Sequence, residues 1–286
     1  MIAVTGATGQ LGQLVIDALL KTLPAAEIAA AVRNPGKAQD LAARGVLVRE
    51  ADYDRPETLA HAFAGVDKLL LISSSEIGKR VAQHQAAIEA ARHAGVKLLV
   101  YTSLLHADRS PLALAEEHRQ TETLIRASGI PYVILRNGWY TENYTASIPS
   151  ALAHGAHFGS AGEGRIASAS RQDYAEAAAA VLTASEDMSG RIFELAGDEP
   201  YTLTQFAAEI ARRSGKPVVY QDLPEADFKA ALVNAGLPEP FAGVLADSDA
   251  GVAQGALDDD GHALRALIGR PTTSLATMVS KALDSV

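Results

Sequence analysis

The sequence predicts an α/β fold, a doubly wound parallel sheet followed by a smaller, mostly helical C-terminal lobe. Short apolar runs alternate with helical segments along residues 1–135. The runs are continuously apolar rather than alternating with polar residues, which is typical of strands whose two faces are both covered by helices. The first run also ends in a glycine-rich turn that leads straight into a helical segment, as at the start of a Rossmann-like sheet.

The expected strands are short apolar runs, each bounded by glycine, proline or polar residues. They cover residues 1–5, 27–32, 46–49, 67–72, 96–101 and 131–135. The segments between them place apolar residues at helical spacing, as Leu11, Val15 and Leu19 do before Pro24 ends the first helix. We expect helices over residues 11–23, 36–44, 79–94 and 111–128. This order indicates parallel strands joined by helices on both faces of one sheet.

The regular alternation ends after Arg136. Glycines break residues 155–166 into a loop-rich stretch. Within it, Gly159 to Gly164 are expected to form either a mobile flap over the substrate or a plain surface loop. Residues 1–136 are expected to form a Rossmann-like domain, to whose sheet a strand at residues 190–197 returns, and residues 137–286 mainly a C-terminal lobe on the substrate side. The elements expected in this second half are helices over 171–185 and 202–214, strands at 192–196 and 218–220, and a mostly helical remainder.

Composition excludes several classes of function. The 286 residues include no cysteine, which excludes disulfides, thiolate metal sites and cysteine nucleophiles. The 25 Lys and Arg against 34 Asp and Glu give a formal net charge of −9, which argues against a nucleic-acid partner. His106 and Asp108 lack a third ligand nearby, so no metal is expected. With neither a secretory segment nor a long apolar stretch, we expect a cytoplasmic protein without membrane insertion, and the sequence is compatible with an oligomer.

The most informative motif is the turn that follows the first strand and opens the first helix. Its glycines, Gly6, Gly9 and Gly12, have the spacing G-x-x-G-x-x-G. We expect Gly6 to allow a tight turn, Gly9 to let a pyrophosphate approach the backbone, and Gly12 to let the helix pack close to the sheet. The free N–H groups at the helix start then face the anion. A strand–helix turn without a ligand is the alternative; the residues expected to bind the dinucleotide are Gly6, Ala7, Thr8, Gly9, Gln10 and Leu11.

The residue that ends the second strand distinguishes NADPH from NADH. An acid there would bind the ribose 2′-hydroxyl of NADH, but the strand ends at Arg33 and no acid lies in the turn. A guanidinium suits a 2′-phosphate in both charge and geometry. The sequence therefore predicts NADPH as the cofactor, with a solvated surface arginine as the alternative. The fourth strand ends in Ser73, Ser74 and Ser75, which are small enough to line the same cofactor.

Longer segments add to the glycine turn, namely residues 1–12, 32–35, 69–75, 101–108 and 135–144. Together they resemble the NmrA-like atypical short-chain dehydrogenase/reductases, and among them the bacterial NAD(P)H:quinone oxidoreductases of type 2. The resemblance implies two-electron hydride reduction of quinones to hydroquinones without a flavin. It implies NADPH binding by Gly6 to Leu11, Arg33, Ser73, Ser74, Ser75, Asn137, Gly138, Trp139, Tyr140, Thr141 and Glu142, and substrate binding by Asn143 and Tyr144.

The catalytic dyad of ordinary short-chain dehydrogenases, a Tyr with a Lys four residues later, is missing, since none of the eight tyrosines has a Lys at that spacing. His118 lies near the place of that Tyr, and Glu122 near the place of the Lys. Reduction of a quinone restores an aromatic ring, so orientation against the nicotinamide supplies most of the catalysis. Tyr140 and His118 are the candidates for polarising or protonating the quinone oxygen. The alternatives are a packed aromatic beside Trp139 and an exposed helical histidine.

The sequence thus predicts an oxidoreductase with NADPH as cofactor and a small-molecule quinone as substrate. Two rival hypotheses need the same glycine turn. One is a redox sensor that binds NADP(H) and regulates a partner without turnover, as some NmrA-like proteins do. The other is a reductase of different planar, electron-poor substrates such as triphenylmethane dyes. An open pocket beside the nicotinamide would separate the enzymes from the sensor.

Overall fold

The chain forms the predicted doubly wound parallel sheet. The computed structural model describes residues 1–285, and its main sheet has seven strands in the order β3-β2-β1-β4-β5-β6-β8. The strands β1 to β6 pair in parallel. The bounds are β1 Ile2–Thr5, β2 Ile28–Val32, β3 Leu47–Glu50, β4 Lys68–Leu71, β5 Leu98–Leu104, β6 Tyr132–Asn137 and β8 Ile192–Leu195.

Burial explains why these apolar runs are strands. Every residue of β1 and β2 is buried, and in β4 to β6 only the first residue of each strand is partly exposed. A strand covered on both faces needs such a continuous apolar run. The strand order reverses between β1 and β4. Ligands of open α/β sheets bind outside the carboxyl ends of the strands at such a reversal. The loops after β1 and β4 are therefore the expected ligand-binding region.

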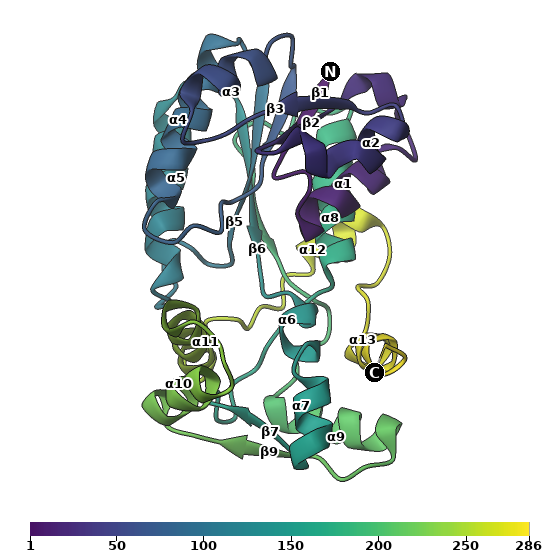
Figure 1. The fold of residues 1–286 in the computed structure, drawn as a ribbon, viewed down its shortest axis with the longest axis vertical. Helices are drawn as coiled ribbons and strands as arrows, with labels where there is room; N and C mark the ends of the chain where they lie inside the picture. The colour runs from purple at the N-terminus through teal and green to yellow at the C-terminus, as the bar shows by residue number, and fades with distance from the viewer. Residues whose placement is uncertain (286) are drawn as a thin grey trace. The chain divides into compact units, whose positions relative to one another are not determined.

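Helices cover both faces of this sheet. Figure 1 shows α3, α4 and α5 on one side of it and α1, α2 and α8 on the other. The helix α1 packs against α8, and α3 packs against α4. The helix α3 was not predicted, because its seven residues are too few for a helical period to stand out. The bounds are α1 Gln10–Leu19, α2 Gln39–Ala43, α3 Pro56–Ala62, α4 Arg80–His93, α5 Leu114–Ala127 and α8 Arg171–Thr183.

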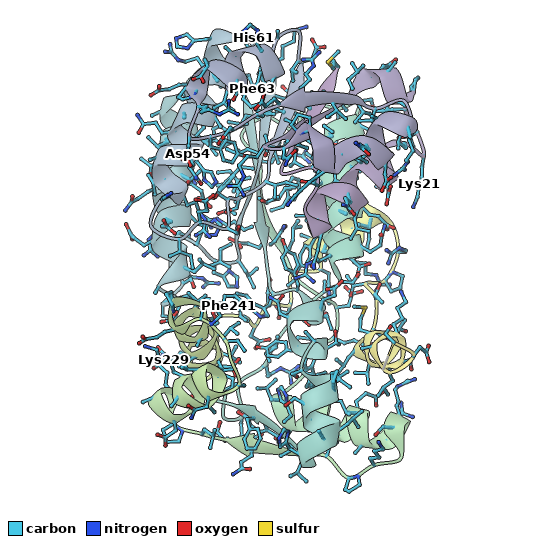
Figure 2. All side chains as sticks on the ribbon, in the orientation of Figure 1. Lys21, Asp54, His61, Phe63, Lys229 and Phe241 are labelled. Atoms are coloured by element: carbon cyan, nitrogen blue, oxygen red, sulfur yellow. The ribbon has the colours of Figure 1, made fainter. Side chains whose placement is uncertain are left out.

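A buried apolar cluster joins the sheet to α3, α4 and α5. Leu69 of β4 and Tyr101 of β5 are both 0% exposed within it, as is Phe63, which follows α3. Figure 2 shows Phe63 beside His61, which comes from the last turn of α3 and is exposed. The residue that ends this helix thus anchors the loop before β4, which helps to fix the start of that strand.

The chain divides into two compact units. The first comprises Met1–Ala107, Glu117–Asn137 and Arg171–Phe193 and contains most of the main sheet. The second comprises Asp108–Glu116, Gly138–Ser170 and the chain from Glu194 onward. Within residues 1–285 no helix combines the length and the apolar character needed to cross a bilayer. The second unit contains a parallel sheet of β7 Ala156–Gly159 and β9 Val219–Asp222, and the helices α6 Thr141–Thr145, α7 Ile148–His154, α9 Leu203–Ser214, α10 Glu225–Asn234, α11 Glu239–Val252, α12 Ala263–Ile268 and α13 Leu275–Leu283.

The stretch expected to be loop-rich, residues 155–166, contains a strand, because β7 lies within it. Residues 160–164 form a bend and a turn after β7, as a loop would, and their movement over a substrate stays a prediction. The glycines of this segment serve close packing. A Cβ atom added at Gly164 would lie 2.3 Å from the carbonyl oxygen of Val252, and one at Gly159 would lie 2.7 Å from a methyl group of Leu203. The sequence could not show this, since the pairing of β7 with β9 joins segments far apart in the chain.

Candidate functional site

The glycine turn after β1 has the geometry of an anion cradle. Gly6 adopts a φ of +58°, in the left-handed region, and its carbonyl oxygen accepts a hydrogen bond from the N–H of Gly9 at 2.9 Å. Gly9 is the N-cap of α1 and supplies no side chain to cap the helix, and the first turn contains no acid. The first N–H groups of a helix have no acceptor within it. The start of α1 therefore offers unpaired donors and a positive dipole end to an anion.

Gly12 is required by close contact with the turn itself. A Cβ atom at this position would lie 2.4 Å from the carbonyl oxygen of Gly6 and 2.7 Å from the Cα of Ala7. The sequence analysis attributed this glycine to packing of the helix on the sheet. The structure shows that the tight contact is with the backbone of the turn, so a side chain at residue 12 would displace the cradle.

Two threonine side chains join the ends of adjacent strands. The backbone N–H of Ile72, after β4, donates to the hydroxyl of Thr5 in β1 at 2.9 Å. The N–H of Ser73 donates to the hydroxyl of Thr102 in β5, also at 2.9 Å. These bonds bring the glycine turn and the serine segment to the same edge of the first unit, at the carboxyl ends of the strands.

The serine segment is anchored by α4. The backbone N–H of Ser74 donates to His84 at 2.9 Å, and the Nε of Arg80 donates to the carbonyl oxygen of Ser74 at 2.7 Å. The hydroxyl of Ser74 donates to the side chain of Gln83 at 2.5 Å. Of the three serines predicted to line the cofactor, Ser74 thus directs both its amide and its hydroxyl to the protein. Ser73 is partly exposed and Ser75 is exposed.

A buried aromatic cluster lies beneath this segment. The Tyr101 ring is edge-on to His84, with ring centroids 5.4 Å apart, and tilted against His118 at 5.9 Å. The Tyr101 hydroxyl and the Nδ1 atom of His118 are 2.8 Å apart. Burial, assisted by the positive charge of Arg80, lowers the pKa of His84 to about 3 and that of His118 well below its ordinary value. Both histidines are therefore neutral.

His118, one of the two predicted catalytic residues, is only 5% exposed. This excludes the alternative of an exposed helical histidine. Four residues later in α5, Glu122 is 1% exposed and forms two hydrogen bonds with Arg136, at 2.9 and 2.8 Å. Burial alone would raise the pKa of Glu122, but the bonds from Arg136 and from Ser103 outweigh it and hold that pKa below its ordinary value. Glu122 is therefore an ionised anchor between α5 and the sheet.

Arg33 directly follows β2, as predicted, and its side chain is 70% exposed. It is not simply solvated, because its Nη1 atom lies 2.9 Å from Oε1 of Glu76. Glu76 comes from the segment between β4 and α4, and sequence analysis missed it. Its position directly after the three serines was the available signal, since side chains after strand ends gather at the ligand-binding edge.

Asn137, the last residue of β6, carries an unpartnered acceptor. It is 4% exposed, and its Oδ1 atom is buried without a hydrogen-bond partner in the described structure. The backbone N–H of Leu105 donates to its carbonyl oxygen at 2.9 Å, which holds the residue in place beside the end of β5. A buried carbonyl oxygen without a donor carries a free-energy penalty, and a ligand N–H would remove it.

The remaining predicted residues belong to the second unit. Gly138 and Trp139 are buried, Tyr140 and Glu142 are partly exposed, and Asn143 is exposed. The hydroxyl of Thr141 is paired with that of Ser168 at 2.8 Å. Tyr144 is 7% exposed, and its hydroxyl donates to Oδ1 of Asp249 at 3.1 Å. Burial raises the pKa of Asp249 to about 6.

Together these features of the first unit fit a phosphorylated dinucleotide. The acid-free start of α1 suits a pyrophosphate, Arg33 suits a second phosphate on the adenosine, and the Asn137 oxygen suits an amide donor. No group of three or more His, Cys, Asp or Glu residues suited to a metal ion occurs among residues 1–285.

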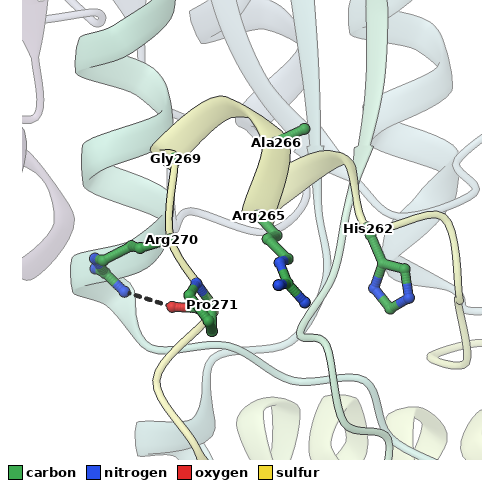
Figure 3. A pocket seen from close by; sticks show the side chains of 6 residues that line it. All are labelled: His262, Arg265, Ala266, Gly269, Arg270 and Pro271. Carbon is green, nitrogen blue, oxygen red and sulfur yellow. Dashed lines mark hydrogen bonds between the residues drawn. The ribbon is translucent and has the colours of Figure 1, made fainter.

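A separate pocket of about 450 Å³ lies in the second unit, around α12 (Figure 3). His262, Arg265 and Arg270 give it a basic lining, which Ala266, Gly269 and Pro271 complete. The Nδ1 atom of His262 lies 3.3 Å from Oδ1 of Asp198. The Nη1 atom of Arg270 donates to the carbonyl oxygen of Pro271 at 2.9 Å. None of the residues predicted to bind cofactor or substrate lines this pocket.

Comparisons with known proteins find relatives that extend along almost the whole chain. The model of a family described as "NmrA-like family" matches residues 1–277. Quinone oxidoreductase 2 of Escherichia coli is 59% identical over 280 residues, which cover 98% of each chain. A crystal structure of an NADPH-dependent quinone oxidoreductase from Escherichia coli, complexed with NADPH, has a TM-score of 0.97 and 58% identity, covering 99% of this chain and 100% of that one. That of the Citrobacter sp. triphenylmethane reductase, complexed with NADP(H), has a TM-score of 0.95 and 42% identity, with the same coverage.

Proposed function

The chain belongs to the NmrA-like family, and from this membership we propose that it is an NADPH-dependent reductase that converts quinones to hydroquinones by hydride transfer without a flavin. The family predicted from the sequence motifs is thereby confirmed. The observation that carries the proposal is the 59% identity with a quinone oxidoreductase over 98% of both chains. Coenzyme binding is assigned mainly to residues 1–136, completed by residues 137–142, and substrate specificity mainly to the remainder of residues 137–286.

The residues of the first unit support a specific role for each part of the coenzyme site. The N–H groups at the start of α1 bind the pyrophosphate, with Gly6, Ala7, Thr8, Gly9, Gln10 and Leu11 forming the cradle. The Arg33 guanidinium binds the 2′-phosphate. The unpartnered oxygen of Asn137 accepts an amide N–H of the coenzyme. Ser73, Ser75 and the segment of Gly138, Trp139, Tyr140, Thr141 and Glu142 complete the lining, with Ser74 holding the backbone of its loop.

Bound NADPH supplies the hydride, and the protein supplies orientation and control of protons. Tyr140 is the residue we assign to polarise the quinone oxygen, because its side chain is partly exposed. His118 is buried against Tyr101, so we assign it a supporting role through that hydroxyl. Asn143 contacts the substrate directly. Tyr144, whose hydroxyl is bonded to Asp249, contributes its ring face.

The test of the proposed function is NADPH oxidation by the purified protein with benzoquinone as acceptor. We expect quinone-dependent loss of the NADPH absorbance in the absence of added flavin, and hydroquinone as product without semiquinone radical. A stimulation by flavin or a radical signal would contradict direct hydride transfer. A folded protein that binds NADPH but leaves it unoxidised would instead support a redox sensor without turnover.

A second candidate function is reduction of triphenylmethane dyes. The observation that favours it is the 42% identity with the Citrobacter sp. triphenylmethane reductase over 99% of this chain. Both reactions deliver a hydride to a planar, electron-poor carbon framework. Comparison of kcat/KM for benzoquinone and for a triphenylmethane dye decides between them, since this ratio measures discrimination between competing substrates.

A further inference from the structure

We propose that Glu76 determines coenzyme specificity by holding Arg33 in the free protein and yielding it to the 2′-phosphate of NADPH. The proposal rests on the function proposed above, which requires Arg33 to bind that phosphate. Neither residue is near the other in sequence, since 43 positions separate them. The Glu76 carboxylate is paired with the same Arg33 guanidinium that an incoming 2′-phosphate would bind.

The geometry makes Glu76 a competitor for the same N–H group. Nη1 of Arg33 lies 2.9 Å from Oε1 of Glu76, and Nζ of Lys79 lies 3.5 Å from Oε2 of the same carboxylate. A guanidinium binds carboxylates and phosphates through the same planar donors. A 2′-phosphate therefore either displaces Glu76 from Arg33 or binds next to its negative charge. Both arrangements weaken NADPH binding relative to a protein without this carboxylate.

The position of Glu76 is held by the buried network below it. The backbone N–H of Glu76 donates to the hydroxyl of Ser74 at 3.2 Å, and Ser74 is in turn bonded to Arg80 and His84. The Glu76 side chain is 35% exposed, half the value of 70% for Arg33. Glu76 is therefore the less exposed partner of the pair and holds the Arg33 guanidinium in the free protein.

NADH lacks the phosphate that this ion pair opposes. Its 2′-hydroxyl is neutral, so it neither needs the Arg33 charge nor is repelled by Glu76. The carboxylate therefore lowers the preference for NADPH over NADH without affecting how the pyrophosphate and nicotinamide are bound. Glu76 therefore sets the ratio of NADPH affinity to NADH affinity at an intermediate value.

The experiment measures dissociation constants of NADPH, NADH and 2′-AMP for the full chain and for Glu76→Gln. We expect NADPH and 2′-AMP to bind about 1.5- to fivefold more tightly to the variant, the range that loss of one exposed ion pair allows. NADH affinity is expected to stay unchanged. Glu89→Gln is the matched control, since Glu89 is exposed on α4 in the same unit and its carboxylate accepts a hydrogen bond from the Gln85 amide at 2.9 Å.

Glu76→Gln in an Arg33→Ala background separates the effect of the Arg33–Glu76 ion pair from other effects of the Glu76 charge. There, Glu76→Gln is expected to give a smaller gain in NADPH affinity, because only direct repulsion between the carboxylate and the 2′-phosphate remains. A gain of the same size as in the wild-type background would show that the ion pair with Arg33 does not matter and would overturn the proposal. An unchanged or weaker NADPH affinity in the single variant, or an equal gain for NADH, overturns it as well. Failure of the proposed function has a different signature, because NADPH would then bind without being oxidised by benzoquinone, and the affinities of Glu76→Gln would still test the specificity role. A wild-type protein that binds neither NADPH nor 2′-AMP would overturn both.

Discussion

The Nε2 atom of His84 accepts a hydrogen bond from the backbone N–H of Ser74 across 2.9 Å. An amide nitrogen only donates, so this ring nitrogen carries no proton, and Nδ1 must donate to the Thr121 hydroxyl 2.9 Å away. The hydroxyl of Thr121 then donates to the carbonyl oxygen of Glu117 at 2.8 Å. His84 is thus held as one neutral tautomer, which links α5 through α4 to the serine segment.

Replacement of His84 should loosen coenzyme binding through this link. His84→Phe removes the Nε2 acceptor and leaves the Ser74 amide without a hydrogen bond. This should lower the free energy of unfolding by about 1–3 kcal/mol. We expect the KM for NADPH to rise about tenfold, with a smaller change in kcat. His84→Gln, whose amide oxygen is able to accept the same bond, should recover part of the loss. Equal KM values in the two variants would show that the ring is only a packing residue.

Gly12→Ala should collapse the anion cradle. The added methyl would lie 2.4 Å from the carbonyl oxygen of Gly6, a backbone atom that cannot move without opening the turn. We expect a loss of about 1–3 kcal/mol in the free energy of unfolding and no measurable NADPH binding. Gly243→Ala in α11 is the matched control, because its Cβ would meet only the side chain of Lys229 at 3.7 Å. Urea denaturation and NADPH titration of both variants check this, and tight NADPH binding by Gly12→Ala would contradict it.

Arg136→Met should be far more destabilising than Arg126→Met. Both arginines bond to Glu122, but the side chain of Arg136 is 6% exposed and that of Arg126 is 39% exposed. Removal of the buried partner leaves the Glu122 carboxylate with only the half-exposed Arg126 and the Ser103 hydroxyl, and loss of a buried ion-pair partner typically costs about 3–5 kcal/mol. Removal of the exposed partner should cost about 1 kcal/mol or less. Similar losses in the two variants, measured by denaturant unfolding, would contradict a buried ion pair that depends on Arg136.

Asp249 should make the protein less stable as the pH rises. Burial raises its pKa from 3.8 to about 6, so the folded protein keeps this proton at a pH where the unfolded chain has lost it. Stability is then lost as the pH rises from about 4 to about 6, by up to about 3 kcal/mol. Asp249→Asn carries no charge and keeps an acceptor for Tyr144. The difference in unfolding free energy between variant and wild type should therefore grow over that range, and a constant difference would show that Asp249 ionises normally.

Tyr140→Phe should lower kcat for benzoquinone by about 10²–10⁴-fold, the usual contribution of a positioned proton donor. The KM for NADPH should change little, because the hydroxyl acts on the substrate. Tyr132→Phe is the matched control, since Tyr132 lies at the first position of β6 and has no proposed role. Full turnover in Tyr140→Phe would exclude the hydroxyl from the reaction.

Local patterns in the sequence predicted the elements that depend on neighbouring residues. The glycine spacing after β1, the apolar strands and the position of Arg33 at the end of β2 were all predicted correctly, because a turn, a buried strand and a strand end each depend on a few consecutive residues. The short helix α3 and the strand β7 were missed. The first is too short for a period, and the second is defined by its pairing with β9.

Side-chain partners, in contrast, were decided by the tertiary structure. Arg33 meets Glu76 across 43 positions, and Tyr144 meets Asp249 across 105. The sequence by itself determined that a guanidinium ends the second strand and that a carboxylate follows the fourth. Only the parallel packing of the strands brought the two charges within 2.9 Å, because a charge pair between distant segments forms where the hydrophobic core, and not the local backbone, holds those segments together.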